Sequence, residues 1–157
     1  MVTIRQITAA VNQRCKMAMA LAGYQNPQCS SLNREEPPRP GCITNISSGA
    51  TVQAGGMAVR TINVLIMFFP EDEESPYDEL KNMDDCLTRA FLNPIFVDGY
   101  RVLPNDEGIT VRVDVDHDIL DVVVSYEFDL AEEEILLELV DEENIMETLQ
   151  DAYCEGE

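Results

Sequence analysis

The stretch RTINVLIMFF, residues Arg60–Phe69, decides the fold, and Pro70 follows it directly. Isoleucine, valine and phenylalanine favour a β-strand, and proline cannot continue a hydrogen-bonded ladder. Both alternating sets of side chains are largely apolar toward the end of this stretch. We therefore predict a central strand that is covered on two sides and forms the core, since burying each large apolar side chain contributes about 1.5–3 kcal/mol.

The residues before this strand predict a β-hairpin. The glycine-rich sequence SSGATVQAGGM, residues 47–57, separates the strand from a short apolar stretch that ends at Ile46. Residues 43–69 are therefore predicted to form a hairpin with a protruding loop. This loop is either a mobile surface loop or a docking finger, because long loops in compact domains often carry function. The candidate docking residues are Ser48, Gly49, Gln53, Gly55, Gly56 and Met57.

An amphipathic helix is predicted at the start of the chain, over residues 1–22. Thr3 and Gln6 have the spacing of a capping box, in which each side chain bonds the backbone amide of the other residue. Apolar residues then recur every three or four positions as far as Leu21, which is typical of one buried helix face. Residues 24–42, which follow, are rich in proline and serine and indicate a connector.

A second helix is predicted over residues 75–93. The acidic turn Glu71–Glu74 comes first, and Ser75 is expected to cap the helix with proline at the first helical position. Tyr77 and the apolar residues at helical spacing after it are expected to form the buried face.

The remaining sequence predicts further strands, over residues 95–129. Gly99 separates the short apolar stretches IFV and YRVL, and the stretches ITVRVDV and ILDVVVSYEF alternate between apolar and polar residues. This alternation is typical of antiparallel strands with one exposed face. A last helix is predicted over residues 141–153, whereas residues 131–140 fit either a strand or the start of a helix.

The order of these elements predicts the fold class. We expect a single domain, residues 1–157, of the α+β class, with a mixed, mainly antiparallel sheet flanked by helices. No apolar run approaches the roughly 18 residues of a membrane span. The first residues also lack the pattern of a secretory signal, so we expect a cytoplasmic location for the newly made chain.

Charge is unevenly distributed along the sequence. The formal net charge is −20; residues 1–70 carry six basic and two acidic side chains, and residues 71–157 carry four basic and 28 acidic ones. An acidic surface repels phosphate, so sequence-specific binding of nucleic acid is not expected. Two interpretations stay open: a solubilising surface, or a contact between the basic half of one subunit and the acidic half of a neighbour.

No residue pattern indicates catalysis, a cofactor or a metal. The Walker A, G-x-G-x-x-G, G-x-S-x-G and H-E-x-x-H motifs are absent. The five cysteines include no C-x-x-C pair, and the aspartate-rich turn around His117 lacks the glycine and the final glutamate of an EF-hand loop. We therefore expect a protein that is not an enzyme, and thiols that are simply buried or partly exposed.

Several short stretches carry a family resemblance through their order and spacing. They are TIRQI near the start, FFP at Phe68–Pro70, the acidic turn after it, NPIFVDGYRV at Asn93–Val102, and VVVSYEF at Val122–Phe128. In this order they resemble the tail terminator, or tail-completion, proteins of long-tailed bacteriophages and related phage-tail-like particles. The branch they resemble most is found in phages and prophages of Gram-positive bacteria, and the resemblance covers most of the chain.

The resemblance implies a structural virion protein without catalysis. An α+β subunit of this family assembles as a hexameric ring on the head-proximal end of the tail tube, stops its polymerisation and offers a surface to the head. The implied partners are further copies of the chain, the tail tube protein and the neck or head connector protein, with the sheath as a further candidate. Glu71, Asp72, Glu73 and Glu74 are candidates for an acidic channel or interface patch.

Two alternatives stay open at this point. A neighbouring neck or head–tail joining protein would have a similar size. An acidic cytoplasmic adaptor that binds basic partners would also suit the charge, but it would not form a ring.

Overall fold

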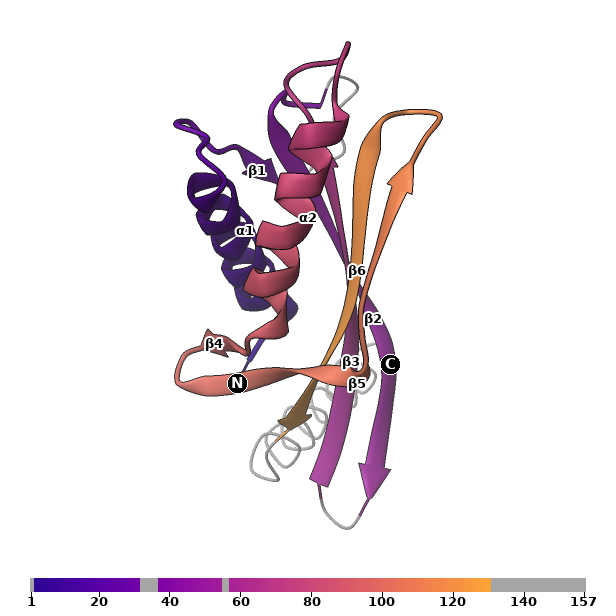
Figure 1. The fold of residues 1–157 in the computed structure, drawn as a ribbon. Coiled ribbons are helices and arrows are strands. Elements are labelled where there is room, and N and C mark those ends of the chain that lie inside the picture. Colours follow the sequence, from indigo (N-terminus) through magenta and orange to yellow (C-terminus); the bar gives the residue numbers. More distant parts are fainter. Residues whose placement is uncertain (1, 32–36, 55–56, 131–157) are drawn as a thin grey trace, which may run out of the picture.

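The computed structural model describes residues 2–31, 37–54 and 57–130, and within them the chain forms two helices and a six-stranded sheet (Figure 1). The elements in chain order are α1 (Ile4–Leu21), β1 (Cys29–Ser30), β2 (Gly41–Ala54), β3 (Met57–Phe69), α2 (Tyr77–Leu92), β4 (Ile95–Val97), β5 (Tyr100–Asp114) and β6 (Ile119–Leu130). The strand order is β1-β2-β3-β6-β5-β4, with β1 parallel to β2 and every other pair antiparallel. The predicted α+β class is confirmed. The predicted helix at 141–153 and the segment 131–140 lie outside the described residues.

Strand β3 lies at the centre of the sheet, between β2 and β6. Its pairing with β2 runs from Met57 to Phe69, and its pairing with β6 runs from Ala58 to Phe68. Four side chains on its inner face are completely buried, namely Ile62, Val64, Ile66 and Phe68. Each contributes about 1.5–3 kcal/mol by burial, so this face supplies much of the core.

The expectation that β3 is covered on two sides is wrong for the described residues. Both α1 and α2 pack on one face of the sheet (Figure 1). On the opposite face Asn63 is exposed, and Leu65 and Met67 are half-buried. Phe69 is buried at the end of this face, where the Arg39 guanidinium lies 5.7 Å from its ring centre. Apolar residues on both faces of a strand therefore did not reveal which face the helices cover.

Helix α1 begins with the predicted capping box. The Gln6 amide nitrogen donates to Thr3 Oγ1 at 3.2 Å, and the Thr3 amide nitrogen donates to Gln6 Oε1 at 2.9 Å. Leu21 was expected on the buried face but is 80% exposed, because it faces a groove toward α2 rather than the sheet. The buried residues of this helix are Ile7, Val11, Cys15, Ala18 and Met19.

Helix α2 begins without the predicted serine cap. Pro76 occupies the N-cap position and no side chain caps the helix, because Asp72 organises the preceding turn instead. Its Oδ1 accepts from the backbone nitrogens of Glu74 at 3.0 Å and Ser75 at 3.3 Å. Tyr77, also expected inside, is 54% exposed, since the buried face starts one turn later. That face consists of Leu80, Met83, Leu87 and Phe91.

The predicted loop at residues 47–57 is largely strand. Strand β2 continues to Ala54 and β3 starts at Met57, so the hairpin is a long two-stranded ribbon. The register shifts between Ser48 and Thr51. A Cβ atom on Gly49 would lie 3.1 Å from the Thr61 carbonyl oxygen, so glycine suits the close approach at this irregularity. The glycine therefore marks a bulge within the strand, where the sequence had suggested a loop.

Strand β5 is also longer than expected. The predicted short pair is present as β4 with the start of β5, in which Ile95 is paired with Val102. The chain then continues as one strand to Asp114, with a register shift between Pro104 and Ile109 opposite β6. This irregularity lets a single strand pair with β4 at one end and with β6 along the rest of its length.

Replacing Tyr126 by phenylalanine should lower the free energy of unfolding by about 1–3 kcal/mol. The Tyr126 side chain is completely buried, and its hydroxyl donates to the Phe91 carbonyl at 3.0 Å, in the last turn of α2. Tyr126→Phe deprives that buried carbonyl of its donor. Urea unfolding at a fixed protein concentration measures the change. The matched control Tyr100→Phe, at a tyrosine that is 45% exposed, should change stability little; equal losses in the two variants would contradict the assignment.

Candidate functional site

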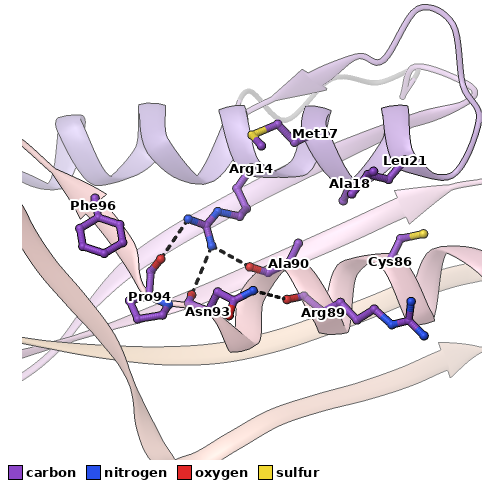
Figure 2. A pocket seen from close by; sticks show the side chains of 10 residues that line it. All are labelled: Arg14, Met17, Ala18, Leu21, Cys86, Arg89, Ala90, Asn93, Pro94 and Phe96. Atoms are coloured by element: carbon purple, nitrogen blue, oxygen red, sulfur yellow. Dashed lines mark hydrogen bonds between the residues drawn. The ribbon is translucent and has the colours of Figure 1, made fainter.

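An apolar groove opens between α1 and α2 (Figure 2). Its volume is about 690 Å³, and it is lined by both helices and by the segment from Asn93 to Phe96. Three large apolar side chains in it are exposed to solvent: Met17 by 55%, Leu21 by 80% and Phe96 by 64%. A cluster of exposed apolar side chains in one hollow is typical of an interaction surface.

The local structure explains why these side chains point outward. Met17 and Leu21 lie one turn apart on α1, beside the stripe that packs on the sheet. In β4 the side chains alternate, so that Ile95 and Val97 are buried and Phe96 is exposed. The groove thus arises where two elements each leave apolar residues outside the core.

Arg14 joins the elements that form the groove. Its Nη1 donates to the carbonyl oxygens of Ala90 at 2.8 Å and Asn93 at 3.3 Å, and its Nη2 donates to that of Pro94 at 2.9 Å (Figure 2). The last carbonyls of a helix lack intrahelical donors and carry partial negative charge. The Arg14 guanidinium therefore caps the C-terminal end of α2 and fixes its distance from α1.

Other side chains complete this cap. Asn93 Nδ2 donates to the Arg89 carbonyl at 3.1 Å, and the Tyr126 hydroxyl donates to the Phe91 carbonyl. The groove lining also includes the Arg89 side chain, and none of the described residues that line it is an aspartate or a glutamate. In a chain with a net charge of −20, the groove is thus an apolar surface with two cations.

Replacing Arg14 by alanine should lower the free energy of unfolding by about 1.5–3 kcal/mol, the range for hydrogen bonds from charged groups. The half-buried guanidinium holds three carbonyls at the end of α2, and alanine removes all three bonds. The control is Arg5→Ala on the same helix, at an exposed position. Chemical unfolding of both variants checks the prediction, and a loss in Arg14→Ala no larger than that in Arg5→Ala would refute it.

The candidate docking residues lie along the distal part of the hairpin. Ser48 and Gln53 are exposed on β2, and Ser48 Oγ accepts from Arg60 Nη2 at 3.1 Å. Gly49 is half-buried at the bulge, and Met57 is the first residue of β3. Gly55 and Gly56 lie outside the described residues. Val52, which sequence reasoning did not select, is 61% exposed near the end of the hairpin.

The acidic patch lies at the opposite end of β3. All four residues of Glu71–Glu74 are exposed. Strand β3, Met57–Phe69, separates these acidic residues from the far end of the hairpin. A strand of this length spans about 40 Å at about 3.4 Å per residue. Glu73 Oε1 lies 3.2 Å from Arg39 Nε, so part of this charge is paired. The structure therefore does not bring the two predicted surfaces together, and neither of them borders the groove.

In the turn around His117, the imidazole contacts an aspartate side chain. His117 Nδ1 lies 3.0 Å from Asp114 Oδ2, and this hydrogen bond lowers the pKa of the half-buried Asp114 carboxyl. Within residues 2–31, 37–54 and 57–130, no group of three or more His, Cys, Asp or Glu is arranged to hold a metal ion. The helices of the same ranges are also too short or too polar to cross a membrane.

Sequence reasoning did not find the groove, although two signals for it were present. The apolar surface of α1 is wider than the stripe that packs on the sheet, since the exposed Met17 lies beside that stripe. A phenylalanine in the middle of the three-residue strand β4 also has to point away from its buried neighbours. What the sequence could not indicate is that these residues line one groove between α1 and α2.

Comparisons with known proteins identify no family. No protein-family model matches the chain, and no curated protein matches it.

Proposed function

We propose that the protein is a tail terminator, a structural subunit that forms a homohexameric ring on the head-proximal end of a phage tail tube. The ring stops polymerisation of the tube and offers a surface to the neck or head connector. The observation that carries this proposal is the two-ended shape of the subunit, with the β2–β3 hairpin at one end and the acidic turn at the other (Figure 1). Such a ring needs one surface for the tube, another for the connector, and sides that contact its neighbours.

The hairpin is the proposed contact with the tail tube. It extends beyond the helices at one end of the molecule (Figure 1). Its strand β3 is paired with both β2 and β6 along nearly its whole length, so the projection is continuous with the core. A ribbon supported in this way can contact a partner with little loss of conformational freedom on binding.

The acidic turn Glu71–Glu74 is then the surface directed toward the connector or the channel. It follows the C-terminal end of β3, whereas the connection between β2 and β3 lies at the other end of this strand. Exposed carboxylates repel the phosphates of passing DNA. In the proposed ring, the two groups of site residues lie on opposite faces. The ring would be assembled in the host cytoplasm and become part of the virion.

The groove between α1 and α2 is the proposed contact between neighbouring copies. Adjacent subunits of a cyclic ring meet through two different patches. The groove supplies one patch, with exposed apolar side chains and the arginines Arg14 and Arg89, and its described lining residues include no carboxylate. A second copy has an excess of acidic side chains in residues 71–157, which complements this patch in charge.

Replacing Leu21 by glutamate should dissociate the ring. The side chain is 80% exposed in the subunit, so Leu21→Glu leaves the fold intact but places a charge in the apolar contact. The control Val115→Glu introduces the same charge at another exposed apolar residue, 69% exposed in the turn between β5 and β6. Light scattering should give six copies for the wild type and for the control, and fewer for Leu21→Glu. A wild-type monomer, both free and on tails, would contradict the ring itself.

Replacing Val52 by glutamate should produce tails of irregular or excessive length. The substitution places a charge at the end of the proposed tube contact without removing a core residue. Electron microscopy of assembled tails measures their length distribution. The control Ser47→Glu alters an exposed position on the same strand, nearer the middle of the sheet. Normal tail length with Val52→Glu protein incorporated would count against the hairpin as the docking element.

A further inference from the structure

The groove between α1 and α2 has the composition of a site for an acidic amphipathic segment. Leu21 and Phe96, which are 80% and 64% exposed, present apolar surface in it. Among its described lining residues, the charged side chains are the two arginines Arg14 and Arg89. The Arg89 side chain is exposed and forms no ion pair with a described residue. An occupant that complements this groove therefore combines an apolar stripe with carboxylates.

The sequence after β6 has this combination. Residues 131–157 contain eleven aspartates and glutamates and no lysine or arginine. The helix predicted at residues 141–153 carries apolar residues at positions i, i+3 and i+7, namely Met146, Leu149 and Tyr153. This is the spacing of the anchors by which an amphipathic helix binds an apolar groove. The chain thus encodes both a groove and a segment that matches it in charge and in apolar spacing.

The end of β6 directs the chain away from the helices of its own subunit. The Tyr126 hydroxyl contacts the Phe91 carbonyl in the last turn of α2, at one end of the groove. From Tyr126, β6 continues to Leu130, the register partner of Ala58, and extends past the helical layer (Figure 1). Residues 131–140 span up to about 35 Å when extended. The helix predicted at 141–153 can therefore reach a subunit that lies beside its own.

We propose that residues 141–153 of one copy bind, as an amphipathic helix, in the groove between α1 and α2 of the neighbouring copy. Met146, Leu149 and Tyr153 contact the exposed apolar residues of the groove. The carboxylates beside this stripe face Arg89, whose guanidinium is accessible at the edge of the groove. This inference rests on the proposed ring and identifies the segment of the neighbour that fills the groove.

The contact suits a closed ring because it is formed by two different patches of the chain. Each subunit offers one groove and one acidic segment, so every groove is filled when the ring closes. The contact also places carboxylates of a strongly acidic chain against cations, and thereby offsets part of the repulsion between neighbouring copies. Without the segment, the apolar side chains of the groove would stay exposed to water.

The first experiment maps the occupant of the groove by photo-crosslinking in the full-length chain. The crosslinking residue p-benzoylphenylalanine replaces Leu21, and in the control it replaces Val115, which is 69% exposed in the turn between β5 and β6. Isotope-labelled and unlabelled chains are mixed, so that mass spectrometry separates links between chains from links within one chain. The Leu21 probe should link to a peptide from residues 141–153 of another chain, and the Val115 probe should not.

Two crosslinking outcomes would overturn the proposal. A link from the Leu21 probe to residues 141–153 within one chain would show that the segment covers the groove of its own subunit. Links to another part of a neighbouring copy, or to none, would show that a different surface occupies the groove or that it stays open.

The second experiment changes the apolar stripe of the segment and measures the mass in solution by light scattering. Leu149→Glu places a charge on the proposed contact face and should convert the six-copy ring into single subunits. Thr148→Glu adds the same charge on the other side of the predicted helix and should leave six copies. A ring that persists in Leu149→Glu would overturn this contact and leave the ring standing. A wild-type chain that is a monomer, both free and on tails, would contradict the ring and this contact together.

Discussion

The buried face of β3 is the constraint on which the rest of the structure depends. Ile62, Val64, Ile66 and Phe68 are completely buried, and the strand is hydrogen-bonded on both sides along nearly its whole length. A strand with no free edge and an apolar face from Ile62 to Phe68 requires a covering layer on that face. Helices α1 and α2 together form this layer. The groove, the hairpin and the acidic turn are therefore all positioned relative to β3.

A second constraint acts at the end of α2. Carbonyl oxygens of its last turn are satisfied by side chains from three different elements, with Arg14 from α1, Asn93 after the helix and Tyr126 from β6 as donors. These bonds hold the end of α2 against both the sheet and α1. The groove keeps its shape because one of its lining residues, Arg14, is also the structural cap of the neighbouring helix.

The β2–β3 ribbon and the acidic turn are exposed because both helices pack on one face of the sheet. The β2–β3 ribbon extends past the helical layer, and the acidic turn lies where β3 leaves the sheet toward α2 (Figure 1). Because β3 connects the hairpin to the acidic turn, the separation of these two surfaces is fixed by the length of this strand and not by flexible linkers. Fixed spacing between opposite surfaces suits a subunit that connects two partners in a stack, which is the role proposed for this protein.

The sequence by itself determined the α+β class, the central strand and the capping box of α1, because each depends on residues close together along the chain. Apolar alternation also indicated the strands after residue 95. The tertiary structure alone decided which face of β3 is covered, that the glycine-rich stretch is largely strand, and that Asp72 replaces Ser75 in the turn before α2. It also placed Met17 and Phe96 in one groove, because helix packing and strand order set this arrangement and neither has a local signature in the sequence.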